Sequence, residues 1–210
     1  MIFEMNRICV ATSKARAYYA LVSRLRRAEL PFSSVLPGSD CRDCELVLTT
    51  ADEAEQLGVA ALALEGLDEN PGIFKGQVMS RLNGEGDTIL VGVDPGKRTG
   101  LAVFYGRTKL AFNTFESAAA VCSRVGSFAR ALPASRLLVR IGNGNRSMVT
   151  RFVDGFRKEV PGAIIEVVDE SGTSTASAKM KGIQRDQVAA AKIAFRKGEV
   201  VGHGTPRSHG

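Results

Sequence analysis

Asp94 is the residue of this chain that most strongly indicates chemistry, because it directly follows the apolar run Ile89–Val93. A carboxylate at the end of a strand-like stretch is costly to bury unless it meets a cation, so this position favours a metal ion or a basic partner. The tripeptide Asp94-Pro95-Gly96 is equally typical of a turn, in which Asp caps, Pro fixes φ and Gly accepts a positive φ. The spacing alone leaves both interpretations open.

The cysteines are a second set of residues with reactive side chains. Cys41 and Cys44 have the C-x-x-C spacing of redox pairs and of zinc half-sites. We favour chance spacing within a loop over zinc, and the four cysteines are too few and too scattered for a disulfide framework. A structural zinc would need two more ligands, from Cys9, Cys122, His203 and His209.

The basic residues are concentrated in the second part of the chain. Residues 1–84 contain 9 Lys and Arg against 11 Asp and Glu, whereas residues 85–210 contain 19 against 11, so the net charge of +6 arises entirely from the second part. A basic domain attracts polyanions, which makes nucleic acid the leading partner class. A basic surface that only keeps the protein in solution is the simpler alternative.

The apolar periodicity of residues 1–84 predicts a small Rossmann-like α/β domain. The Gly-rich stretch Asn83–Asp87 marks its boundary. This domain could select substrate, form a homodimer contact or bind a protein. Strands are expected at Arg7–Thr12, Phe32–Leu36, Glu45–Thr49 and Val59–Leu64, and helices at Ser13–Glu29, Ala51–Leu57 and Gly72–Leu82.

Residues 85–200 predict a second α/β domain with the element order β-β-β-α-β-α-β-α, which begins as an antiparallel meander. Residues 201–210 are expected to form a flexible polar tail. Strands are expected at Ile89–Val93, Leu101–Tyr105, Lys109–Thr114, Arg136–Ile141 and Ala163–Val168, and helices at Phe115–Ala131, Ser147–Val160 and Gln184–Lys197.

Three ordered motifs in this second domain resemble one group of nucleases. Val91–Gly96, followed by Thr99–Ala102, resembles the first strand and turn of RuvC and YqgF nucleases. Val167–Thr175 resembles the Asp-Glu-Arg-x-Ser/Thr-Thr segment of YqgF, with Ser171 in place of the arginine. Arg185–Ala191 resembles the final helix, whose aspartate precedes an alanine-rich packing face. The resemblance spans about residues 87–198 and implies a mixed sheet of the ribonuclease H-like (Holliday junction resolvase-like) superfamily.

The chain departs from the resolvases at the end of the fourth strand. RuvC resolvases have a glutamate there, whereas this chain has Arg140-Ile141-Gly142-Asn143. The resemblance is therefore closer to YqgF than to RuvC. Since YqgF proteins are usually a single domain of this fold, residues 1–84 lie outside the resemblance.

The resemblance implies that Asp94, Glu170 and Asp186 are the catalytic carboxylates. Phosphodiester hydrolysis develops charge on phosphate oxygens and needs an activated water, and Mg²⁺ or Mn²⁺ held by carboxylates supplies both. Asp169 could share or take over the role of Glu170 as a metal ligand. Each acid also has a structural interpretation, since Asp186 suits the first turn of a helix and Glu170 a solvated loop.

Basic and polar residues flank these acids and could bind the nucleic-acid backbone without reading its sequence. Lys97 and Arg98 follow Asp94 in the turn, and Gly142–Arg146 offers flexible backbone N–H groups. For any single lysine, a solvated loop is the simpler interpretation. The expected nucleic-acid contacts are Lys97, Arg98, Asn143, Arg146, Thr173, Lys179, Lys181 and Arg185.

The leading hypothesis is a metal-dependent endonuclease that acts on structured nucleic acid, such as branched DNA or precursor ribosomal RNA. The alternative is a catalytically inactive nucleic-acid-binding protein that keeps the ribonuclease H-like fold. A nucleotide-phosphate site of the actin and sugar-kinase type is a third interpretation, but only one Asp-x-Gly turn of that kind is apparent. Because no signal-peptide pattern and no run of roughly 18 apolar residues is present, a cytoplasmic location with no membrane partner is expected.

Overall fold

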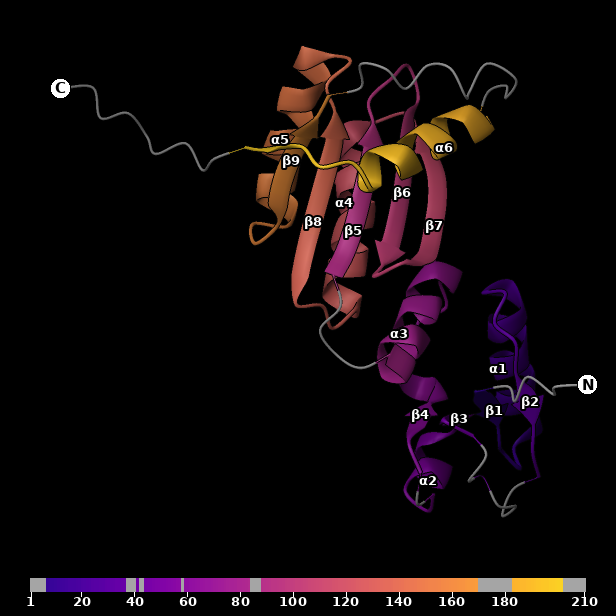
Figure 1. The fold of residues 1–210 in the computed structure, drawn as a ribbon. Coiled ribbons are helices and arrows are strands. Elements are labelled where there is room, and N and C mark those ends of the chain that lie inside the picture. Colours follow the sequence, from indigo (N-terminus) through magenta and orange to yellow (C-terminus); the bar gives the residue numbers. More distant parts are fainter. Residues whose placement is uncertain are drawn as a thin grey trace, which may run out of the picture. The chain divides into compact units, whose positions relative to one another are not determined.

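The computed structural model describes residues 7–36, 41, 44–57, 59–83, 88–169 and 183–201. The chain divides into two compact units. The first unit consists of Met1–Glu85 with Ala131–Pro133, and the second consists of Gly86–Arg130 and Ala134–Gly210. Each unit is built on its own β-sheet (Figure 1).

The first unit has a four-stranded parallel sheet with the strand order β2-β1-β3-β4. Its strands are β1 (Ile8–Val10), β2 (Ser33–Ser34), β3 (Leu46–Thr49) and β4 (Ala61–Ala63). Its helices are α1 (Ala15–Arg27), α2 (Ala51–Ala54), the short 3₁₀ helix η1 (Leu64–Gly66) and α3 (Pro71–Asn83). The elements follow the predicted order, although β2 and α2 are shorter than expected.

Alternation along β1 divides the core of this unit between the two faces of its sheet. Ile8 and Val10 lie in one buried cluster, to which α1 and α3 contribute. Helix α1 buries Ala17, Leu21 and Leu25, which recur every four residues and therefore lie on one face of the helix. The periodicity that predicted this helix is thus the periodicity of its buried side.

Cys9, between Ile8 and Val10, lies on the opposite face and forms a disulfide with Cys44. This disulfide corrects the expectation drawn from the cysteine spacing. The two cysteines are 35 positions apart in sequence, but β1 and β3 are neighbouring strands, which brings them together. Because Cys44 is oxidised, the pair Cys41 and Cys44 is not a zinc half-site in this structure.

A polar cluster joins the loops at the carboxyl ends of β1 and β3. Thr12, Ser13 and Thr50 donate hydrogen bonds to the carboxylate of Glu53. Burial would raise the pKa of Glu53, but these hydrogen bonds outweigh burial and hold its pKa well below the usual range. Glu53 is therefore a charged structural group that fixes both loops.

The second unit has a six-stranded mixed sheet with the strand order β10-β9-β8-β5-β6-β7. Strands β5, β6 and β7 form the predicted antiparallel meander, whereas β8 and β9 run parallel to β5. The short edge strand β10 was not predicted, because two exposed residues give no periodic signal. The strands are β5 (Thr88–Asp94), β6 (Thr99–Tyr105), β7 (Thr108–Phe115), β8 (Arg136–Gly142), β9 (Ile164–Val168) and β10 (Glu199–Val200).

Helices cover both faces of the mixed sheet (Figure 1). Helices α4 (Ala118–Ala131) and α5 (Arg146–Glu159) lie on one face, and α6 (Ile183–Ala194) crosses the other. Helix α6 lies very close to β5 because Gly92 has no side chain. A Cβ at Gly92 would lie only 2.0 Å from the carbonyl oxygen of Ala190.

A largely buried ion pair holds the carboxyl end of α6. Arg140 of β8 donates to Glu166 of β9 at 2.7 Å and to the Ala194 carbonyl oxygen at 2.7 Å. Glu166 also accepts the backbone N–H of Gly198, which follows the helix. Arg140 therefore satisfies a carbonyl group at the helix terminus and fixes where α6 crosses the sheet.

Both units are α/β, one with a parallel sheet and one with a mixed sheet, which confirms the predicted fold class at this level. None of the described helices combines the length and the apolar character that a membrane crossing requires. The tail predicted at residues 201–210 lies outside the described residues except for Val201.

Candidate functional site

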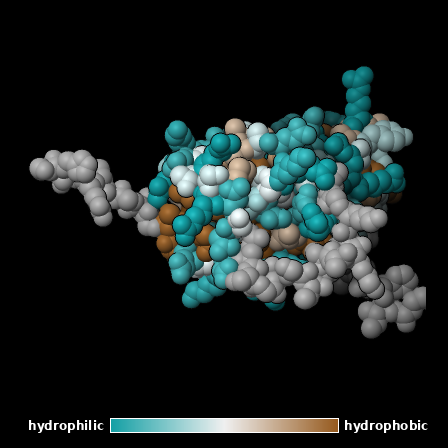
Figure 2. All heavy atoms as spheres, turned by 90° about the horizontal axis from the view of Figure 1, so that it is seen from above, coloured by the Kyte–Doolittle hydropathy of each residue, from teal (hydrophilic) through white to brown (hydrophobic). Residues whose placement is uncertain are grey.

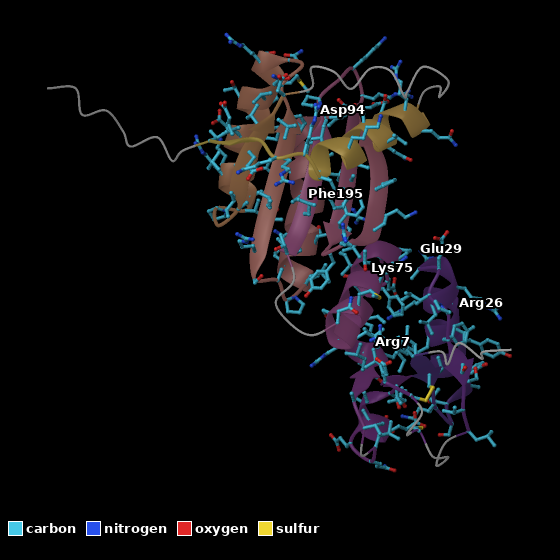
Figure 3. The ribbon with its side chains drawn as sticks, viewed as in Figure 1. Arg7, Arg26, Glu29, Lys75, Asp94 and Phe195 are labelled. Carbon is cyan, nitrogen blue, oxygen red and sulfur yellow. A yellow bond between two sulfur atoms is a disulfide. The ribbon has the colours of Figure 1, made fainter. Side chains whose placement is uncertain are left out.

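Three strands of the mixed sheet end at one edge, because β5, β8 and β9 are parallel. Asp94 is the last residue of β5, Asn143 follows β8 and Asp169 follows β9. Figure 3 shows Asp94 at this edge of the sheet. Ligand sites of α/β proteins are common at the carboxyl ends of parallel strands. This edge is therefore the candidate functional site of the second unit.

Asp94 and the first turn of α6, which carries Asp186, both lie next to Gly100. Asp94 pairs with Gly100 of β6 across the β5–β6 hairpin. Asp186, in the first turn of α6, lies directly over that glycine, since a Cβ at Gly100 would be 2.2 Å from the Asp186 carbonyl oxygen. Two acids that are far apart in sequence are thus neighbours at this edge.

Asp186 lies in surroundings that favour negative charge. Its side chain is only 15% exposed, and the helix dipole stabilises a carboxylate in the first turn of α6. The Nε atoms of Arg98 and Arg185 each lie 3.9 Å from an Asp186 carboxylate oxygen. These ion pairs are long and involve exposed arginines, so they are weak. Both guanidinium groups therefore remain able to bind an anionic ligand.

Asn143 and Asp169 form a separate polar pair. The Asn143 amide donates to the Asp169 carboxylate at 3.2 Å. Because strand side chains alternate, Asp169 continues the side of β9 that carries Val167, which faces away from α6. Asp94 continues the side of β5 that carries Gly92, beneath α6. Asp169 is therefore at the same edge as Asp94 but on the other side of the sheet.

The described residues hold no group of three His, Cys, Asp or Glu side chains that could bind a metal ion. Asp94 and Asp186 are the predicted ligands that lie together, and carboxylate oxygens are the donors that Mg²⁺ and Mn²⁺ prefer. Glu170, the third predicted catalytic acid, lies outside the described residues. The metal site therefore stays a prediction.

The predicted nucleic-acid contacts that the structure describes are exposed. Thr173, Lys179 and Lys181 lie outside the described residues. Figure 2, which views the molecule from the end where Asp94 lies, shows hydrophilic side chains over much of the described surface. The exposed contacts are Lys97 and Arg98 in the β5–β6 turn, Asn143 after β8, Arg146 at the start of α5 and Arg185 on α6.

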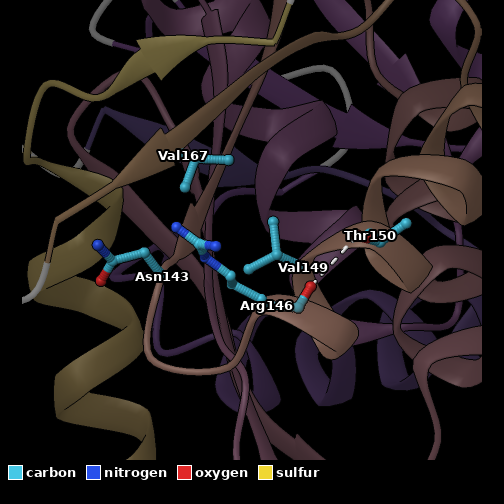
Figure 4. Close-up of a pocket in the computed structure, with 5 residues that line it drawn as sticks. All are labelled: Asn143, Arg146, Val149, Thr150 and Val167. Carbon is cyan, nitrogen blue, oxygen red and sulfur yellow. Dashed lines mark hydrogen bonds between the residues drawn. The ribbon is translucent and has the colours of Figure 1, made fainter.

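A hollow of about 380 Å³ lies beside Asn143, on the α5 side of the sheet (Figure 4). Sequence reasoning identified two of its lining residues and missed the valines and the threonine. Such residues on half-buried elements carry no sequence signal that separates a cavity wall from the core. The lining residues are Asn143, Arg146, Val149, Thr150 and Val167.

Gly100→Ala is expected to displace Asp186 from its place beside Asp94. The new Cβ would lie 2.2 Å from the Asp186 carbonyl oxygen, so the first turn of α6 must move. Overpacking of this kind costs about 1–3 kcal/mol, which thermal or denaturant unfolding would measure. Gly162→Ala is the matched control, because a Cβ at Gly162 meets nothing within 4 Å. Equal stability of the two variants would contradict the close contact between α6 and β6.

No protein-family model matches this chain, and the curated proteins include no match to it. The function is therefore inferred from the chemistry and the geometry of the residues described above.

Proposed function

We propose that the second unit is a metal-dependent endonuclease that hydrolyses phosphodiester bonds in structured nucleic acid, such as branched DNA or precursor ribosomal RNA. The observation that carries this proposal is that the first turn of α6, which carries Asp186, lies over Gly100, the residue that pairs with Asp94. These acids belong to two of the three motifs on which the nuclease resemblance rests. A purely structural role for either acid would not require them to lie together.

The architecture supports a ribonuclease H-like assignment for this unit. From β5 to α6 the elements follow the order β-β-β-α-β-α-β-α, which is the order that the resemblance implies. Helix α6 crosses β5 and β6 at the end of that series and carries Asp186 to the strand that ends in Asp94. The fold thereby accounts for how the first and third motifs come together.

The chemistry of the donor set fits a hard divalent cation. Asp94, Asp186 and, on the resemblance, Glu170 would hold Mg²⁺ or Mn²⁺, which when bound would stabilise phosphate charge and activate a water molecule. Arg98 and Arg185 lie beside Asp186 and would bind backbone phosphate. Lys97, exposed in the same turn as Arg98, adds positive charge for the polyanion.

Metal-dependent cleavage by the full chain tests the proposal. Labelled branched DNA, single-stranded RNA and precursor ribosomal RNA are incubated with Mg²⁺, with Mn²⁺ or with EDTA, and the products are separated by denaturing electrophoresis. We expect cleavage of at least one substrate with a metal ion and none with EDTA. Binding of all three substrates without cleavage under either metal would contradict the proposed hydrolysis.

A nucleic-acid-binding protein without hydrolysis is the second candidate function. The observation that favours it is Asn143, an amide at the fourth-strand position where a resolvase has an acid, bonded to Asp169. This candidate predicts binding that weakens steeply with salt and does not respond to Mg²⁺ or Mn²⁺ beyond ionic strength. The same substrate panel distinguishes the two functions.

A further inference from the structure

The hollow beside Asn143 combines a cationic, a polar and an apolar wall. Figure 4 shows the Arg146 guanidinium between Asn143 and Val149 and directed toward Val167. Arg146 is the first residue of α5, and Asn145 caps this helix by accepting the Met148 backbone N–H. The cap fixes the backbone of the first turn of α5, from which the Arg146 side chain extends.

The size of the hollow selects a small ligand. Its volume of about 380 Å³ is at the lower end of the roughly 300–1,000 Å³ typical of small-molecule sites. An arginine fork binds phosphate oxygens in pairs. Val149 and Val167 offer an apolar surface to a flat ring. A nucleotide has both the anionic phosphate and the flat ring that these walls require.

The location of the hollow relates it to the candidate catalytic edge. Asn143 lines the hollow and is bonded to Asp169, at the edge where β5 ends in Asp94. The hollow lies on the α5 side of the sheet. Asp94 lies on the other side, beneath α6, and Asp186 belongs to α6 itself. A nucleic-acid strand that crosses this edge could therefore place one nucleotide in the hollow while its phosphate backbone passes Asp94 and Asp186.

We infer that the hollow is a nucleotide subsite that accepts one unpaired nucleotide of the nucleic-acid substrate. Arg146 binds its phosphate, and Val149 and Val167 contact its base. The inference rests on the proposed function for its choice of a nucleic-acid substrate, but it concerns binding and does not require hydrolysis. It predicts that the protein prefers strands with an unpaired base over strands that have lost their bases.

The test compares a short single-stranded oligonucleotide with an abasic strand of equal length and charge, by fluorescence anisotropy with the full chain and no divalent metal. We expect the parent protein to prefer the normal strand by about tenfold. Val149→Phe fills the hollow and is expected to remove this preference while affinity for the abasic strand stays unchanged. Arg146→Gln is expected to weaken binding and to lower the salt slope by about 1, as for one lost phosphate contact.

The matched control for Arg146→Gln is Arg151→Gln, which removes the same charge from an exposed position on α5 outside the hollow. Equal affinities of these two variants would overturn the subsite, even if Val149→Phe does not fold. Retention of base preference by a folded Val149→Phe protein would also overturn it. Metal-dependent cleavage without base preference would overturn the subsite alone, whereas base preference without cleavage would support the subsite and contradict hydrolysis.

Discussion

Asp94→Asn is expected to lower the rate of metal-dependent cleavage by about 10³-fold, equivalent to ~4 kcal/mol of transition-state stabilisation. The substitution removes the negative charge that a hard metal ligand needs but keeps the size of the side chain. Asp94 ends β5 beside buried Pro95 and Gly100, so a larger change would disturb the hairpin as well as the charge. The rate is measured under single-turnover conditions with saturating Mg²⁺ or Mn²⁺.

Nucleic-acid affinity is not expected to fall with the cleavage rate. In EDTA, Asp94→Asn is expected to bind substrate as tightly as the parent or more tightly, because it removes a negative charge that repels the phosphate backbone at this edge of the sheet. Asp154→Asn is the control, since Asp154 is an exposed acid of the same unit on α5. Equal cleavage rates for the parent, Asp94→Asn and Asp154→Asn would contradict the catalytic role of Asp94.

The main elements of the mixed sheet could be predicted because each has a periodic or apolar signal of its own. The strand β5 is an apolar run buried on both faces, and the meander is marked by tight turns such as Gly106. Asp94 and Asp186 could be predicted because each lies in a motif. That they meet depends on Gly92 and Gly100, whose missing side chains let α6 lie against the sheet. The position of a glycine in the sequence does not predict which helix will pack over it.

Other features depend on which elements become neighbours, and no local pattern reports that. Arg140 lies in a strand pattern that does not predict its partners, yet its side chain bonds Glu166 and the end of α6. Val149 and Val167 come from a helix and a strand that enclose a hollow only after folding. The Cys9–Cys44 disulfide has the same origin, since β1 and β3 are adjacent only in the folded sheet.

Removal of the Cys9–Cys44 disulfide is expected to destabilise the first unit by about 4 kcal/mol. In the chain-entropy model, a bridge between residues 35 positions apart restricts the unfolded chain by that amount at 25 °C. The double variant Cys9→Ala, Cys44→Ala and the parent are unfolded in denaturant in parallel. Unfolding of the first unit is followed by the fluorescence of a label attached at position 19, because Tyr19 is an exposed residue of α1. Reduction of the parent with dithiothreitol is expected to produce most of the same shift.

Dithiothreitol provides the control that separates the bridge from side-chain packing. The double variant should be insensitive to the reductant, whereas Cys122→Ala should stay sensitive because Cys122 is not disulfide-bonded. Burial raises the pKa of the Cys122 thiol to about 11, so it stays protonated and unreactive near neutral pH. Unchanged stability of the parent after complete reduction would show that the bridge does not stabilise the unit. In that case packing of Cys9 in its buried cluster, and not the covalent link, would hold β1 beside β3.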